Sequence, residues 1–236
     1  MVCIVIALGG SLLRPEVDDR HAWLEELIII VRDRVSAGDR IGLVIGGGAP
    51  AREGIGLAHP LIDDVHRLDK IGIAATRLNA TIVREALSDA GISVSGTIPH
   101  RVDEAVQLLE SRPVVVMGGT TPGHTTDTVA IRFAIATSAN RCIIATNVGK
   151  VYSADPRNNS NADAFDKLTH DELQEIVGPD KHTRAGGSSV VDPVGVGEAN
   201  RANMTLNILD GRETNLIKAA LEGNDFKGTT IITEEN

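Results

Sequence analysis

Residues 118–127, with the sequence GGTTPGHTTD, carry the strongest chemical signal in the chain. They follow the apolar run Val114–Met117 and precede a helical pattern that begins near Thr128. Glycines let backbone N–H groups approach a ligand closely, and the first turn of a helix carries partial positive charge. Four threonine hydroxyls add further hydrogen-bond donors. The segment therefore predicts a strand-to-helix loop that binds a phosphate group or a sugar.

Two more glycine clusters follow apolar runs earlier in the sequence. Gly9-Gly10-Ser11 follows residues 2–8, and Gly46-Gly47-Gly48 follows residues 41–45. One such cluster would be weak evidence, since tight turns need glycine anyway. Ligands of open parallel sheets bind beyond the carboxyl ends of the strands, so three clusters predict one shared phosphate-binding edge. Arg52, one helical turn further on, can bind phosphate oxygens through its guanidinium or simply face solvent.

Apolar runs of strand length alternate along the chain with amphipathic segments of helix length, which predicts parallel strands joined by helical crossovers. The strands are continuous Val/Ile/Leu runs, so we expect helices on both faces of the sheet. The fold class is therefore α/β, a three-layer sandwich with a central, mainly parallel sheet. Further strands are predicted at 114–117, 142–146, 205–209 and 229–232, and helices at 18–35, 49–57, 68–89, 102–110, 128–137, 170–176, 188–202 and 212–222.

Length and composition limit the classes of function. At 236 residues and 42% apolar content, the chain fits one α/β domain. A net charge of −9 and 2% aromatic residues argue against nucleic acid as a partner. The apolar start is too short to cross a membrane and lacks the features of a secretory signal. Cys3 and Cys142 have no metal or redox spacing, which favours core thiols in a reducing compartment such as the cytoplasm.

The polar segment 154–166 marks a weak boundary between two lobes of the domain. An N-terminal lobe of about residues 1–140 contains the three glycine clusters. A C-terminal lobe of about 141–236 contains the segments 146–155 and 184–192. This division predicts two substrates that meet above one sheet.

The motifs and their order resemble the amino acid kinase family, and within it the archaeal-type uridylate kinases. The resemblance extends over nearly the whole chain. It rests on Gly9-Gly10-Ser11-Leu12-Leu13, Gly46-Gly47-Gly48 with Ala51-Arg52, Leu68-Asp69-Lys70-Ile71-Gly72, Thr76-Arg77-Leu78-Asn79-Ala80, residues 117–127, Thr146-Asn147-Val148 with residues 151–156, and residues 185–193.

The resemblance implies transfer of the γ-phosphoryl group of ATP to UMP, giving UDP and ADP for pyrimidine nucleotide biosynthesis. Such chemistry depends mostly on positioning and charge neutralisation. By similarity, UMP would contact Gly47, Asp69, Thr120, Thr121, Pro122, Gly123, His124, Thr125 and Thr126. ATP would contact Gly10, Ser11, Gly48, Arg52, Thr146, Asn147, Tyr152 and Asp155.

The resemblance also bears on metal, assembly and regulation. We expect Mg²⁺ to be held by the nucleotide phosphates and water rather than by a dedicated protein site, with Asp127 as the nearest carboxylate. A hexamer built from dimers and competition by UTP at the UMP site are implied. The apolar face of helix 18–35 could pack on a partner or on the sheet, and the sequence leaves both open. Arg77 and Asn79 could orient UMP-binding groups or lie at a subunit contact.

The chain departs from the family pattern at several cationic positions. Ala7 stands where many relatives have a lysine, Ala49 follows the triple glycine, and Gly197 replaces a helix lysine. Loss of one preorganised cationic donor can lower a rate by roughly a hundredfold. Lys150, in the nucleotide-binding segment, is the candidate to replace the missing cation. Lys150 and Arg52 are therefore predicted to be catalytic. The alternative is that Lys150 is a solvent-exposed loop lysine.

Several of these residues also have a purely structural interpretation. Asp69 could cap its helix, His124 could bond its own backbone, and Tyr152 could be an ordinary strand-end aromatic. Asp192 is predicted to cap a helix that has Pro193 at its first position. Two other functions stay open: a family relative that phosphorylates another small anion, and a nucleotide-binding protein that has lost catalysis.

Overall fold

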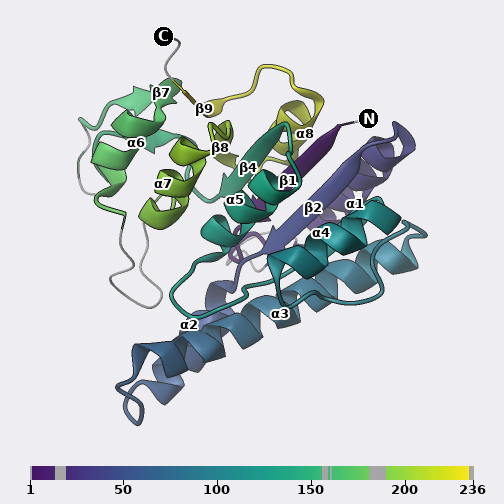
Figure 1. The fold of residues 1–236 in the computed structure, drawn as a ribbon, viewed down its shortest axis with the longest axis horizontal. Helices are drawn as coiled ribbons and strands as arrows, with labels where there is room; N and C mark the ends of the chain where they lie inside the picture. Colours follow the sequence, from purple (N-terminus) through teal and green to yellow (C-terminus); the bar gives the residue numbers. More distant parts are fainter. Residues whose placement is uncertain (1, 14–19, 156–158, 160, 181–189, 234–236) are drawn as a thin grey trace.

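The computed structural model describes residues 2–13, 20–155, 159, 161–180 and 190–233. A seven-stranded sheet has the order β3-β2-β1-β4-β8-β9-β7 and is flanked by helices on both faces (Figure 1). The strands of this sheet are β1 (Cys3–Leu8), β2 (Arg40–Ile45), β3 (Val114–Met117), β4 (Arg141–Thr146), β7 (Lys167–Thr169), β8 (Leu206–Asp210) and β9 (Gly228–Ile232). A separate hairpin pairs β5 (Val151–Tyr152) with β6 (Ala164–Phe165).

Eight helices are present in the described part of the chain, and all eight were predicted. They are α1 (Arg20–Ser36), α2 (Gly48–Ala58), α3 (Val65–Asp89), α4 (Val102–Ser111), α5 (Thr126–Ala136), α6 (His170–Val177), α7 (Pro193–Arg201) and α8 (Thr214–Glu222). The six predicted strands are also confirmed, with ends within one residue. The two- and three-residue strands β5, β6 and β7 are too short to leave a hydrophobic pattern, and the sequence did not predict them.

Strands β3, β2, β1, β4 and β8 are parallel, so their carboxyl ends lie at one edge of the sheet. Only the β8–β9 pair of this sheet is antiparallel, with Leu209 opposite Gly228. Helix α8 returns the chain toward the start of β4, where the Arg141 guanidinium donates to the Ala220 carbonyl. The 223–227 connection then runs back to the carboxyl edge before β9 begins, which reverses that strand.

Two apolar clusters fill the spaces above and below the sheet. Alternate residues of β1 point to opposite clusters: Ile4 and Ile6 pack with α1, α3 and α8, whereas Val5 packs with α4, α5, α6 and α7. In α1, Leu27 and Val31 are fully buried in the first cluster. The face that carries these residues therefore packs on the sheet.

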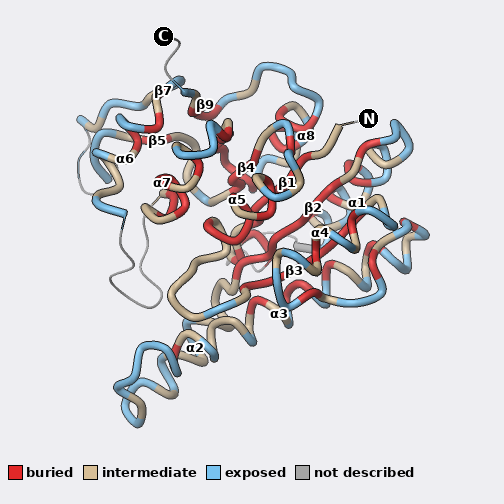
Figure 2. Tube along the Cα trace, viewed as in Figure 1, coloured by how far each residue is buried: buried red, intermediate tan, exposed pale blue. Residues whose placement is uncertain are grey.

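Helices α2 and α3 form an arm that extends beyond the sheet (Figure 1). Helix α2 has no buried residue, and the outer end of the arm is largely exposed (Figure 2). Leu57 and Leu61 are 82% and 88% exposed there. Among the described residues, no helix is both long and apolar enough to cross a membrane.

Helix α7 is the one helix whose start was clearly wrong. It was predicted to begin at residue 188, but residues 188 and 189 lie outside the described residues and α7 begins at Pro193. The Asp192 side chain caps it by accepting a hydrogen bond from the Val194 N–H at 3.0 Å. Its glycines suit close packing: a Cβ atom at Gly195 would lie 2.8 Å from Ile131 Cδ1 of α5. Tertiary packing thus overrides the poor helix propensity of this segment.

Candidate functional site

The first two glycine turns are in direct contact at the carboxyl edge of β1 and β2. A Cβ atom at Gly10 would lie 2.2 Å from Gly48 N and 2.5 Å from Gly46 O, so the two backbones leave no space for a side chain. Gly48 also has a positive φ of 59°, a conformation that other residues rarely adopt. The predicted convergence of these two turns is therefore present in the structure.

The third glycine turn lies against helix α3. The Gly119 N–H donates to Thr76 Oγ1 at 2.7 Å. A Cβ atom at Gly118 would lie only 2.7 Å from the same oxygen. One helical turn further along α3, Asn79 Nδ2 donates to the carbonyl oxygens of Gly46 and Gly47 at 2.8 and 3.0 Å. Helix α3 thus contacts the second and third turns through two polar side chains.

The loop predicted to hold the phosphoryl acceptor follows the third turn and is mostly half-buried. Its Gly123 has a φ of 87°, and the Gly123 N–H donates to Asp69 Oδ2 at 2.8 Å. The interpretation of Asp69 as a helix cap is wrong, because α3 begins at Val65 and the Asp64 side chain caps it. Asp69 instead joins α3 to the acceptor loop.

The loop ends at the start of α5, where two carboxyl groups lie close together. Thr125 caps α5, and its hydroxyl donates to Asp192 Oδ2 at 2.7 Å. Burial raises the pKa of Asp127, in the first turn of α5, to about 7, and the negative charge of Asp192 contributes to the shift. The N-termini of α5 and α7 are therefore joined through Thr125 and Asp192, next to a carboxyl group that readily holds a proton.

Comparison with known proteins places this arrangement in a family. The sequence model of the amino acid kinase family matches residues 2–210. The chain belongs to the amino acid kinase family. It is 37% identical to the uridylate kinase of Methanococcus vannielii over 97% of this chain and 99% of the relative. It is 39% identical to that of Methanospirillum hungatei over 98% and 95%. The crystal structure of uridylate kinase from Archaeoglobus fulgidus superposes with a TM-score of 0.81 at 36% identity, covering 97% of this chain and 99% of that one.

Within this kinase fold, the residues predicted to bind ATP lie at the ends of β1, β2 and β4 and in the β5 hairpin. Gly10 is buried, whereas Ser11, Thr146 and Tyr152 are half-buried. Asn147, Asp155 and Arg52 are exposed, and Arg52 lies in α2. The Gly211 N–H donates to the Thr146 carbonyl at 2.7 Å, which holds the turn after β8 against the end of β4. The nucleotide contacts of these residues stay predictions.

Lys150 and Arg212, two described cations near this edge, are each paired with a carboxylate. The Lys150 ammonium forms an ion pair with Asp166, whose side chain is 85% exposed. Arg212, directly after β8, binds Asp210 through two hydrogen bonds of 2.8 and 2.5 Å. Sequence reasoning placed Arg212 in a helix and missed it as an edge cation, although an Asp-Gly-Arg triplet after a strand is a usable signal. At Gly197, where the family resemblance implies a lysine, a Cβ atom would lie 2.5 Å from Asp180 Oδ2.

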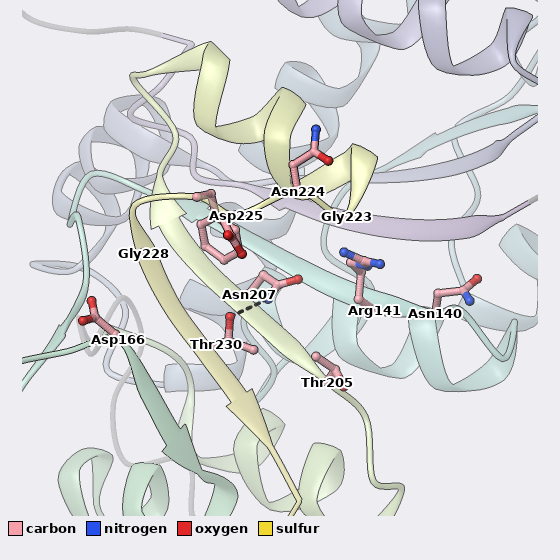
Figure 3. A pocket seen from close by; sticks show the side chains of 11 residues that line it. Asn140, Arg141, Asp166, Thr205, Asn207, Gly223, Asn224, Asp225, Gly228 and Thr230 are labelled. Carbon is pink, nitrogen blue, oxygen red and sulfur yellow. Dashed lines mark hydrogen bonds between the residues drawn. The ribbon is translucent and has the colours of Figure 1, made fainter.

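A cavity of about 510 Å³ lies over β8 and β9 beside the 223–228 connection (Figure 3). Polar groups line most of it, including Arg141, Asp225 and the buried Asn207, whose Nδ2 donates to Thr230 Oγ1 at 3.2 Å. None of the residues predicted to bind nucleotide lines this cavity. It is therefore separate from the glycine turns.

Proposed function

We propose that this protein is a uridylate kinase that transfers the γ-phosphoryl group of ATP to UMP, giving UDP and ADP. The observation that carries the proposal is the convergence of three glycine turns and a threonine-rich loop at one edge of a parallel sheet. This edge offers backbone amides and helix N-termini to phosphate groups from two nucleotides. The choice of UMP as acceptor rests on the uridylate kinase names of relatives that match nearly the full chain.

In this proposal a phosphate oxygen of UMP attacks the γ-phosphorus of ATP, the bond to the bridging oxygen breaks, and ADP leaves. No strong general base is needed, because the UMP phosphate is already anionic near neutral pH. Amides of Gly47 and Gly48 would line the phosphates, while Arg52 and Lys150 would neutralise developing charge. Asp69 and the 120–126 loop would hold UMP. The N-terminal lobe (about 1–140) would take the acceptor and the C-terminal lobe (about 141–236) ATP.

Mg²⁺ would be held mainly by the phosphates and water, which this ion prefers to dedicated protein sites. Asp127 is the carboxyl group best placed to receive a hydrogen bond from a water of its hydration shell, because it lies in the first turn of α5 beside the acceptor loop. The bound ion would favour the ionised form of Asp127 and so lower its pKa from about 7.

The proposal extends to assembly, regulation and place in metabolism. Leu78 and Ile82, on the exposed face of α3, are 52% and 41% exposed, which supports burial against another copy in a hexamer built from dimers. Light scattering over a tenfold concentration range measures this assembly. We further propose cytoplasmic pyrimidine nucleotide biosynthesis as the role and UTP as an inhibitor that competes with UMP.

ADP formation from ATP and magnesium tests the activity, with UMP, CMP, dTMP, GMP and no acceptor in parallel. Rapid turnover confined to UMP is the expected result. Turnover with another small anion, such as a carboxylate or an isoprenoid phosphate, would reassign the acceptor. Measurable UMP binding without turnover would instead favour a non-catalytic nucleotide-binding protein and make the missing lysines decisive.

A further inference from the structure

Helix α3 changes character along its buried face. At Ala80, Val83 and Leu87 this face is apolar and packs in the cluster that it shares with α1. One turn earlier, where α3 passes the glycine turns, the buried residues are Thr76 and Asn79. Asn79 has no exposed surface at all. A buried amide is unfavourable unless its hydrogen bonds are made, so the contacts of Asn79 explain its presence.

Asn79 makes only half of the hydrogen bonds that its side chain can make. Its Nδ2 donates to Gly46 O and Gly47 O, whereas its Oδ1 has no hydrogen-bond partner in the described part of the chain. An aliphatic residue would avoid burying this unpaired oxygen. The side chain is thus poorly suited to pure packing and well suited to holding two successive carbonyl groups.

Holding these carbonyls fixes the direction of the amides next to them. A trans peptide is planar, and its N–H points opposite to its C=O. A hydrogen bond from α3 to Gly46 O therefore turns the Gly47 N–H away from α3, and the bond to Gly47 O does the same for the Gly48 N–H. The contact with Gly10 and the start of α2 restrict these peptides from one side, and the two hydrogen bonds from Asn79 hold them from the other.

Thr76 provides the matching contact for the third turn. Its Oγ1 accepts from the Gly119 N–H and donates to the Ile73 carbonyl at 2.6 Å. Residues three positions apart lie on the same face of a helix. Thr76 and Asn79 therefore hold the second and third turns at a separation that is set by one rigid helix.

We propose that Asn79 is a positioning residue that aims the Gly47 and Gly48 amides at the phosphates of the two nucleotides. This inference rests on the proposed kinase function and adds a residue that touches neither substrate. It adds α3 to the contact between the glycine turns as a second support for the orientation of the phosphate-binding amides.

The test compares Asn79→Ala and Asn79→Asp with Val83→Ala as a matched control. Val83 is also fully buried on α3, one turn further on, and belongs to the apolar cluster away from the turns. For each variant, kcat and KM for ATP and UMP are measured well below its thermal unfolding midpoint. Asn79→Ala is expected to lower kcat by roughly tenfold to a hundredfold, with smaller changes in KM, because misplaced groups act chiefly on the transition state. Val83→Ala should keep its kcat despite its lower midpoint.

Asn79→Asp gives a second readout through pH. A buried aspartate facing two carbonyl oxygens favours its protonated form, which can donate one hydrogen bond again. Its kcat relative to the wild-type protein should therefore fall as pH rises, while the ratio for Val83→Ala stays flat. If Asn79→Ala does not fold, this pH profile still decides the question. Equal kcat losses for Asn79→Ala and Val83→Ala, or a flat profile for Asn79→Asp, would overturn the proposal.

Failure of the kinase assignment gives a different result. In that case the wild-type protein itself shows no turnover with UMP. Calorimetric titration of ATP and magnesium into the same three variants then tests Asn79 directly, since misdirected amides bind phosphate less well. Weaker binding in Asn79→Ala alone would support the positioning role without the kinase function, and equal binding in all three would refute it.

Discussion

Replacing Gly10 by alanine directly tests whether the two glycine turns must touch. In the structure, the new Cβ would lie 2.2 Å from Gly48 N, which is 0.8 Å short of the 3.0 Å that real Cβ atoms keep. The second close atom, Gly46 O, also belongs to the backbone, so no side-chain rotation can relieve the overlap. The first two turns must therefore separate by roughly 1 Å, a misplacement that can lower a catalysed rate by about a hundredfold.

The assay is UDP formation at saturating ATP and UMP, with thermal unfolding recorded for the same preparation. Gly56→Ala is the matched control, because a Cβ at Gly56 of α2 meets no atom within 4 Å. In a helix interior, alanine is more favourable than glycine by about 0.5–1 kcal/mol, so this control should be slightly more stable and fully active. Wild-type turnover by Gly10→Ala, with an unchanged unfolding midpoint, would refute the view that contact between the turns sets the site.

Three further changes test the electrostatics and the helix ends. Asp127→Asn removes a carboxyl group whose pKa is raised from 3.8 to about 7, so wild-type stability should fall as pH rises from about 4 to about 7. In urea unfolding at pH 8, the free energy of unfolding of the asparagine variant should therefore exceed that of the wild type by on the order of 2 kcal/mol, after a discount for partial exposure. At pH 4 the two free energies should be equal. Asp192→Ala loses the α7 cap and the bond to Thr125, and should lower the free energy of unfolding by about 1 to 2 kcal/mol; an unchanged urea midpoint would contradict this. Lys150→Ala should lower turnover about a hundredfold while UMP binding, measured by calorimetry, stays the same; unchanged turnover would remove Lys150 from the mechanism.

The strands, the helices and the binding edge were predictable because each leaves a local pattern. Buried parallel strands need continuous apolar runs, and three of these runs end in glycine clusters. The carboxyl-edge rule for parallel sheets then predicts that the clusters lie together. The extent of α7 was not predictable in the same way, since its stability comes from the fit of Gly195 against α5 rather than from its own residues.

The supports of the site were harder to find. Asn79 was predicted to orient UMP-binding groups or to lie at a subunit contact, and its bonds to Gly46 and Gly47 could not be read from the sequence. Thr76 and Asn79 have the i, i+3 spacing of ordinary core positions, so their pattern is that of a buried helix face. Their partners are 43 and 33 residues away, and a bond from a side chain to a backbone group leaves no trace in the residue type of the partner. The acidic partner of Lys150 was equally hidden, because Asp166 lies 16 residues further along the chain.

Positioning and charge have separate origins in this site. Side chains of α3 hold the second and third glycine turns, whereas Ala7 and Gly197 place no cation at the positions where the family resemblance implies one. Lys150 and Arg212 can reach the phosphates only by leaving an existing carboxylate partner. Asp210 is only 11% exposed at its side chain, so taking Arg212 from it would leave a poorly solvated charge. Asp166 is 85% exposed, and water can replace its lysine easily. An incoming triphosphate therefore destabilises the protein less by binding Lys150 than by binding Arg212.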